Sequence, residues 1–190
     1  MPKSPDKKII IPVHSPDLKE KLFFFISGVI ISVPFTIFFE IFGNGLSVLI
    51  PKFYASILSV AIFGPIIEEF GKAYPLLYRH GETKKSIYTL GFLVGLGFGI
   101  SEFLVYVFIY QAPILVRLFG IFFHSATASI TAYGIATKRT VYFYFIAVLL
   151  HFSTNFSALF PGFWSIIEFG FVILTYLLSF HFYRKILKST

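Results

Sequence analysis

Six long apolar segments, each close to the roughly 20 residues that an α-helix needs to cross a bilayer, limit what this chain can fold into. In lipid every backbone N–H and C=O group must find a partner, so isolated segments of this kind form helices. The turns between them contain Gly, Asn, Pro and charged residues, as in Gly43-Asn44-Gly45. We therefore predict an all-α, polytopic membrane bundle of about six transmembrane helices. We place these helices at residues 21–42, 53–77, 86–110, 113–137, 140–158 and 164–187.

The composition agrees with a membrane protein. Of the 190 residues 56% are hydrophobic and 13% are charged, whereas a soluble domain is about 25% charged. A net charge of +7 would favour nucleic acid in a soluble chain, but here the basic residues stand at helix ends. We expect a lipid bilayer and no nucleic acid as partner. We interpret residues 1–20 as a polar cytoplasmic tail and residues 21–190 as a single transmembrane domain. The sequence does not predict an oligomeric state.

The basic residues also predict an orientation. Six spans put both termini on one side, and that side would hold thirteen of the sixteen basic residues. Cytoplasmic loops are enriched in Lys and Arg, so both termini are predicted to be cytoplasmic, in a multi-pass protein of the cell membrane. The thirteen residues are Lys3, Lys7, Lys8, Lys19, Lys21, Arg79, Lys84, Lys85, Lys138, Arg139, Arg184, Lys185 and Lys188.

Two adjacent glutamates, Glu68 and Glu69, interrupt the second apolar segment. A charge at the centre of a membrane helix costs roughly 2.5–3.5 kcal/mol, so such residues are rare and usually functional. Successive helical residues point about 100° apart, which gives the two glutamates different neighbours. Lys72 lies one turn further on, where it can pair with either of them. Packing alone does not explain this pattern.

More polar residues follow in the third, fourth and fifth spans, namely Glu102, Arg117, His124, His151 and Asn155. When the spans are folded as straight hairpins, these acids, histidines and the amide fall with Glu68 at one depth, within roughly 10 Å of helix rise. His124 is then opposite Gly99. Gly91, Gly95 and Gly99 recur one turn apart, which lets a neighbouring helix approach closely. The sequence therefore predicts one polar site near the middle of the membrane.

Each of these residues alone has a simpler interpretation. An intramembrane histidine is as often a buried hydrogen-bonding residue as a catalyst. Arg117 can extend to the membrane surface or pair with Glu102. Glu69 and Lys72 are expected to form a structural ion pair. As a set, acids and histidines at the midplane are also typical of proton- or cation-coupled transporters, and this alternative stays open.

The motifs, taken in order, resemble a known family. They are Glu68-Glu69-x-x-Lys72, Phe98-x-x-x-Glu102, His124 and His151-x-x-x-Asn155, within about residues 60–158. They resemble the PrsW branch of intramembrane proteases, in the superfamily of type II CAAX prenyl proteases and bacteriocin-processing proteins. The CAAX branch usually has His where this chain has Glu102, which favours the PrsW branch. The resemblance implies peptide-bond hydrolysis in membrane-embedded or membrane-proximal protein substrates. The superfamily also contains a non-catalytic scaffold, so a scaffold role is a further alternative.

Given the hydrolysis that the resemblance implies, the chemistry of these residues favours a glutamate-activated water, without a cofactor. Glu68 is the predicted base, since a buried carboxylate takes up a proton more readily than one in water. His124 would hold the water or protonate the leaving amine. His151 and Asn155 would donate to the oxyanion.

Glu69 and Glu102 complete the predicted catalytic set, and Lys72 and Arg117 have supporting roles. Glu69 would orient the site through Lys72, and Glu102 would share a proton with Glu68 or position a histidine. Arg117 would support the same region.

A metal-dependent version is the nearest rival mechanism. It would use zinc held by two histidines and a carboxylate, His124, His151 and either Glu102 or Glu68, although the motif H-E-x-x-H is absent.

The orientation can be tested with topology reporters. Fusions at Lys84, at Arg139 and at the C-terminus are expected to report a cytoplasmic location, because these positions carry the basic clusters. An exterior signal at Arg139 would contradict both the orientation and the hairpin arrangement on which the predicted site depends.

Overall fold

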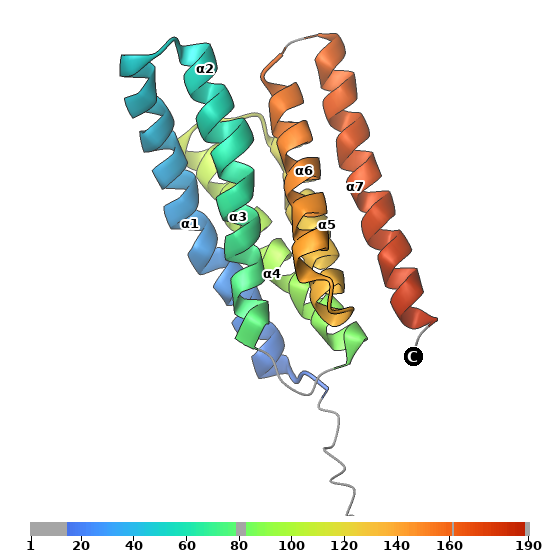
Figure 1. Cartoon of the computed structure of the whole chain (residues 1–190). Coiled ribbons are helices and arrows are strands. Elements are labelled where there is room, and N and C mark those ends of the chain that lie inside the picture. Colours follow the sequence, from blue (N-terminus) through green and yellow to red (C-terminus); the bar gives the residue numbers. More distant parts are fainter. Residues whose placement is uncertain (1–14, 79–82, 161, 189–190) are drawn as a thin grey trace, which may run out of the picture.

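The computed structural model describes residues 15–78, 83–160 and 162–188. Within these residues it is a bundle of helices without strands, and six helical spans are long and apolar enough to cross a membrane (Figure 1). This confirms the predicted all-α membrane bundle. The beginning of α1 and the end of α7 lie at the same end of the bundle, as an even number of spans requires (Figure 1). The side of the membrane that this end faces stays a prediction.

Four of the spans are single α-helices, and the other two contain a π-helical segment. The single helices are α1 (Leu18–Leu49), α5 (Ile114–Ala136), α6 (Thr140–Ala158) and α7 (Phe163–Leu187). The second span comprises α2 (Lys52–Ser56), the π-helical η1 (Ile57–Phe63), α3 (Gly64–Ala73) and the 3-10 helix η2 (Tyr74–Tyr78). The third comprises α4 (Lys84–Leu104) and the π-helical η3 (Val105–Ile109). π-Helical turns are rare and often occur at functional sites, and η1 leads directly into the helix that carries both glutamates.

The predicted turn at Gly43-Asn44-Gly45 is wrong, because α1 continues through it to Leu49. The helix ends instead at Ile50, which is extended (φ −136°, ψ 159°) and precedes Pro51. A residue before proline avoids the α conformation, whereas a glycine inside a helix costs only about 1 kcal/mol. In this case the proline is therefore the stronger signal.

The beginning of α1 also differs from the prediction. Asp17 caps the helix by accepting a hydrogen bond from the Glu20 backbone N–H (2.8 Å), so the predicted tail boundary at residue 20 falls inside α1. Residues 1–14 lie outside the described residues, as do residues 79–82 and 161, which fall between predicted spans.

Glycines bring α4 into backbone contact with the helices on both sides. A Cβ atom on Gly95 would overlap the carbonyl oxygen of His124 in α5, and one on Gly97 would overlap that of Phe25 in α1. The predicted close approach along the Gly91, Gly95, Gly99 face is confirmed.

The predicted register between the third and fourth spans is wrong by one helical turn. His124 lies opposite Gly95 rather than Gly99, and Gly99 lies opposite Ile121. The prediction assumed straight α-helices folding symmetrically about residues 111–112. In the structure the third span ends in the π-helical η3, and Gln111 adopts a positive φ of 55°.

Candidate active site

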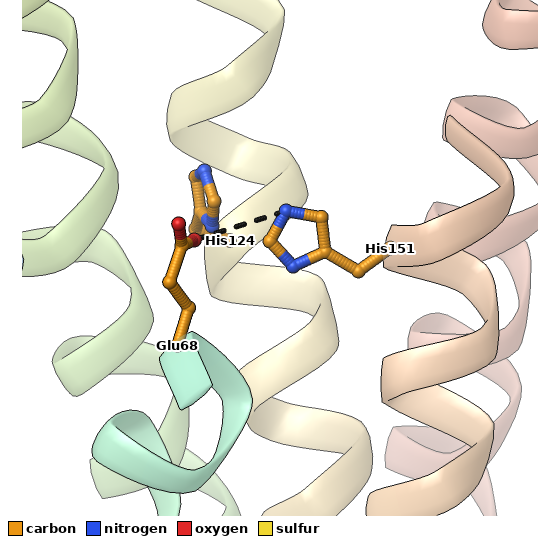
Figure 2. A group of neighbouring side chains, drawn as sticks. All are labelled: Glu68, His124 and His151. Atoms are coloured by element: carbon orange, nitrogen blue, oxygen red, sulfur yellow. Dashed lines mark ion pairs between the residues drawn. The ribbon is translucent and has the colours of Figure 1, made fainter. Parts of the chain in front are cut away.

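Side chains from α3, α4, α5 and α6 meet in the interior of the bundle. Figure 2 shows Glu68, His124 and His151 pointing toward one another from three of these helices. All three are buried, and so is Glu69. Glu102 reaches the same group from α4, where its carboxylate pairs with Nε2 of His124. The structure thus brings together both histidines and the three acids that the sequence singled out.

Lys72 occupies the centre of the hydrogen-bond network. Its ammonium group donates to Oε1 of Glu69 (2.5 Å) and to Oγ1 of Thr127 (3.1 Å), and it lies 3.1 Å from Nδ1 of His124. It is also 4.9 Å from the centre of the Phe98 ring, a favourable position for a cation. Lys72 and Glu69 have no solvent exposure at all. All three N–H donors of the ammonium have partners, so this cation has a structural role.

These contacts fix the protonated nitrogen of each histidine. An ammonium can only donate, so Nδ1 of His124 accepts from Lys72 and the ring proton is on Nε2, facing Glu102. In His151 the pattern is reversed. Its Nδ1 lies 2.8 Å from Oε1 of Glu69, a carboxylate that can only accept, so Nδ1 carries the proton. The lone pair on Nε2 of His151 therefore points toward Glu68.

Glu68 is the one acid of the cluster whose buried oxygen faces a histidine lone pair. Its Oε2 lies 3.8 Å from Nε2 of His151 (Figure 2) and has no hydrogen-bond partner among the described residues. This separation is too long for a direct hydrogen bond and suits a small bridging molecule such as water. Glu68 and His151 together can bind a water and accept a proton from it.

The same groups also fit a metal ion. Glu68, His124 and His151 each offer one ligand atom, and these atoms lie within 4.8 Å of one another. A histidine ligand usually donates its second N–H group to a carboxylate, and here Glu69 accepts from His151 in this way. Two histidines and a carboxylate are a common zinc-binding set in hydrolases. Of the two carboxylates considered from the sequence, Glu68 completes the set in the structure, whereas Glu102 contacts His124.

Asn155 and Arg117 have other contacts. The side-chain amide of Asn155 donates to the backbone carbonyl of Val60 in η1 (3.0 Å), one turn along α6 from His151. The guanidinium group of Arg117 stacks on the ring of Tyr106, 3.6 Å from its centre. The structure therefore places Asn155 at the edge of the site, bound to the protein's own backbone.

Sequence reasoning missed two contributors. Thr127 is not among the residues predicted for the site, yet it accepts a hydrogen bond from Lys72. Tyr144 donates to the backbone carbonyl of Ile66 in α3 (2.7 Å), and nothing in the sequence around it indicates this role. The spacing of Thr127, three residues after His124, is the sequence feature that could have indicated its contact with Lys72.

Comparison with known families supports the resemblance. The model of a family described as "PrsW family intramembrane metalloprotease" matches residues 18–182, most of the chain. The chain belongs to the PrsW family. No curated protein and no solved structure matches it. The match extends well beyond the motif region at 60–158, from the start of α1 into the last turns of α7, so PrsW family membership concerns the whole bundle.

Replacement of Lys72 by methionine is expected to destabilise this PrsW family protein strongly. The variant would leave Glu69 buried without its cation, which typically costs about 3–5 kcal/mol. Thermal unfolding in detergent should show a large drop for Lys72→Met and little change for Lys52→Met, at an exposed position on α2. Adding Glu69→Gln to Lys72→Met should recover part of the loss. Unchanged unfolding of the single variant would contradict the structural role of this ion pair.

Proposed function

We propose that the chain hydrolyses peptide bonds of membrane-embedded or membrane-proximal protein substrates, at a centre formed by Glu68, His124 and His151. The observation that carries the proposal is the unpartnered Oε2 of Glu68, which faces the lone pair of His151 across 3.8 Å. A hydrolase needs a buried base that can hold a water beside the scissile carbonyl. Glu68 meets this requirement, and the PrsW family description as an intramembrane protease supports the same activity.

Each residue has a role that follows from its contacts. Glu68 takes the proton from the attacking water. His151, held by Glu69 through Nδ1, accepts a hydrogen bond from the same water at Nε2. This replaces the oxyanion role expected from the sequence, because a nitrogen with a lone pair cannot donate. Glu68 then gives the proton that it took from water to the leaving amine. Neutral His124, whose Nε2–H group faces Glu102, is too weak an acid for that step and orients the site through its hydrogen bonds.

A metal-dependent version of the same protease is the second candidate. It is supported by the three ligand atoms within 4.8 Å and by the word metalloprotease in the family description. Glu68, His124 and His151 would hold the ion, and Glu69 would orient His151. To offer a lone pair, His124 would have to give up its contact with Lys72 or with Glu102. A bound zinc ion supplies a Lewis acid and lowers the pKa of its water. Neither version changes the proposed substrate class.

The wider assignment is part of the same proposal. We place the chain in the superfamily of CAAX prenyl proteases and bacteriocin-processing proteins, as a single transmembrane domain with cytoplasmic termini in the cell membrane.

The transporter and scaffold alternatives are distinguished by one assay. Purified protein in detergent, with no membrane gradient, should still cut a single-span substrate, whereas a transporter or scaffold should not. Gradient-driven ion flux without any cleavage would favour the transporter.

Glu68→Gln is expected to reduce cleavage of a single-span substrate by a hundredfold or more, roughly the contribution of a general base. Glutamine keeps the shape of the side chain but cannot take a proton from water. Because Glu68 Oε2 has no partner to lose, the melting temperature should stay unchanged. Glu69→Gln is the matched control, and it should lower the melting temperature and reduce cleavage less. Near-normal cleavage by Glu68→Gln with a dead Glu69→Gln would reverse the two assignments.

The metal version is tested by elemental analysis. On the water mechanism the purified protein should contain no stoichiometric transition metal, and cleavage should survive a strong chelator. About one zinc per chain, lost in both His124→Ala and His151→Ala, would instead establish the metal-dependent version.

A further inference from the structure

The proposed hydrolysis needs a hydrogen-bond donor that the residues discussed so far do not supply. Attack by water on a peptide carbonyl leaves negative charge on its oxygen, and preorganised donors stabilise this oxyanion. The side-chain donors already assigned to the site have partners within the protein. They belong to Lys72, His124, His151 and Asn155. A donor for the oxyanion must therefore come from another residue.

Tyr106 has such a donor. It lies in the π-helical η3, one turn after Glu102, and its side chain is half-buried. Its hydroxyl group forms no hydrogen bond with the residues that the structure describes. It lies close enough to the carboxyl groups of Glu102 and Glu68 to interact with both electrostatically. A phenol that faces the proposed base without a partner of its own is free to bind substrate.

Tyr106 continues a line of side chains that already contacts the site. Residues four apart share one face of a helix, and Phe98, Glu102 and Tyr106 follow one another at this spacing. The ring of Phe98 lies 5.0 Å from that of His124 and 4.9 Å from the ammonium group of Lys72. The carboxylate of Glu102 pairs with His124. The two residues before Tyr106 on this face are thus both part of the cluster.

Arg117 holds the ring of Tyr106 from the facing helix. Its guanidinium group stacks on the ring, 3.6 Å from the centre, and it forms no ion pair with a described residue. Gly99 of α4 lies against Ile121 of α5, so one turn further along both helices Arg117 comes level with Glu102. Arg117 also interacts electrostatically with Glu102 and with Glu68. Its positive charge therefore lies near the cluster, and its plane fixes the phenol ring.

We propose that Tyr106 is a further catalytic residue, whose hydroxyl group donates a hydrogen bond to the carbonyl oxygen of the scissile peptide bond. This inference rests on the proposed protease function. As the water oxygen bonds to the carbonyl carbon, Glu68 takes the proton and the carbonyl electron pair moves to the oxygen that Tyr106 binds. When this pair returns, the C–N bond breaks and Glu68 gives its proton to the amine. Tyr106 keeps its own proton throughout, and Arg117 positions it.

Tyr106→Phe tests the donor directly. It is expected to lower kcat for a single-span substrate roughly a hundredfold, the usual effect of removing one oxyanion donor. KM and the melting temperature should stay unchanged, because the ring and its stacking on Arg117 remain and no hydrogen bond within the protein is lost. Tyr110→Phe is the matched control. It removes a hydroxyl group one turn further on, from a side chain that is 41% exposed, and should leave kcat unchanged.

The outcomes separate this inference from the proposed function. If the unmodified chain cleaves and Tyr106→Phe cleaves equally well, the role of Tyr106 is wrong and the protease function stands. An equal loss in Tyr106→Phe and Tyr110→Phe would also overturn the role. If the unmodified chain cleaves nothing, the proposed function fails, and the role of Tyr106 fails with it.

Binding of a transition-state analogue gives a readout that does not require turnover. The probe is a phosphonamidate version of the single-span peptide, whose anionic tetrahedral group imitates the oxyanion. Tyr106→Phe should weaken its binding by the same factor as kcat/KM. Binding of the ordinary amide peptide to the inactive Glu68→Gln variant should not change when Tyr106→Phe is added. Equal weakening of both ligands would contradict a role confined to the transition state.

A double-mutant cycle tests the positioning role of Arg117. Arg117→Gln removes the stacked cation and should lower kcat roughly tenfold in the otherwise unmodified chain. In the Tyr106→Phe background the same change should have little further effect, because both residues act through one hydroxyl group. A full tenfold loss in both backgrounds would show that Arg117 acts independently, and would overturn its role in positioning Tyr106.

Discussion

In the interior of the bundle Lys72 donates to Glu69 and Thr127 and lies against the Nδ1 atom of His124. A buried cation of this kind is tolerated only when every donor has a partner, because an unpaired charge in a low-dielectric interior costs several kcal/mol. The contacts that satisfy Lys72 also determine which nitrogen of His124 carries the proton. Through Glu69 they determine it for His151 as well. The chemistry of both histidines therefore depends on one structural cation.

The glycines of α4 provide the setting for this network. They let α1 and α5 approach α4 so closely that backbones touch, which excludes lipid from the side of the site formed by these three helices. On the opposite side, η1 and α3 meet α6 through side chains around an apolar groove. The irregular η1 contributes the carbonyl of Val60 to this contact. Glu102 and His124 are thus held by closely packed backbones, whereas the elements that carry Glu68, Glu69 and His151 meet through side chains, among them the hydrogen bond from His151 to Glu69.

Much of this arrangement could be predicted from the sequence, because span lengths, turn residues and the spacing of Glu68, Glu69 and Lys72 are local patterns. The meeting of Glu102, His124 and His151 was also predictable, since short connections force neighbouring spans to be antiparallel. The partners of Asn155 and Tyr144 were not, because both are backbone carbonyls of the second span, Val60 in η1 and Ile66 in α3, and no local pattern in the sequence indicates such acceptors. The one-turn error in register has a related cause, as η3 also departs from an ideal α-helix.

Charge balance explains why the same residue is both the proposed base and a proposed metal ligand. Three carboxyl groups, Glu68, Glu69 and Glu102, gather around the single ammonium of Lys72. If all were ionised beside neutral histidines, the cluster would hold uncompensated negative charge in the membrane interior, which is strongly unfavourable. Lys72 neutralises Glu69, and Glu102 accepts a hydrogen bond from neutral His124, whereas Oε2 of Glu68 has no hydrogen-bond partner among the described residues; Glu68 is therefore the acid least stabilised as an anion. Either a proton or a divalent cation can compensate its charge. Electrostatics thus selects Glu68 as the group that changes state, whichever of the two chemistries the site uses.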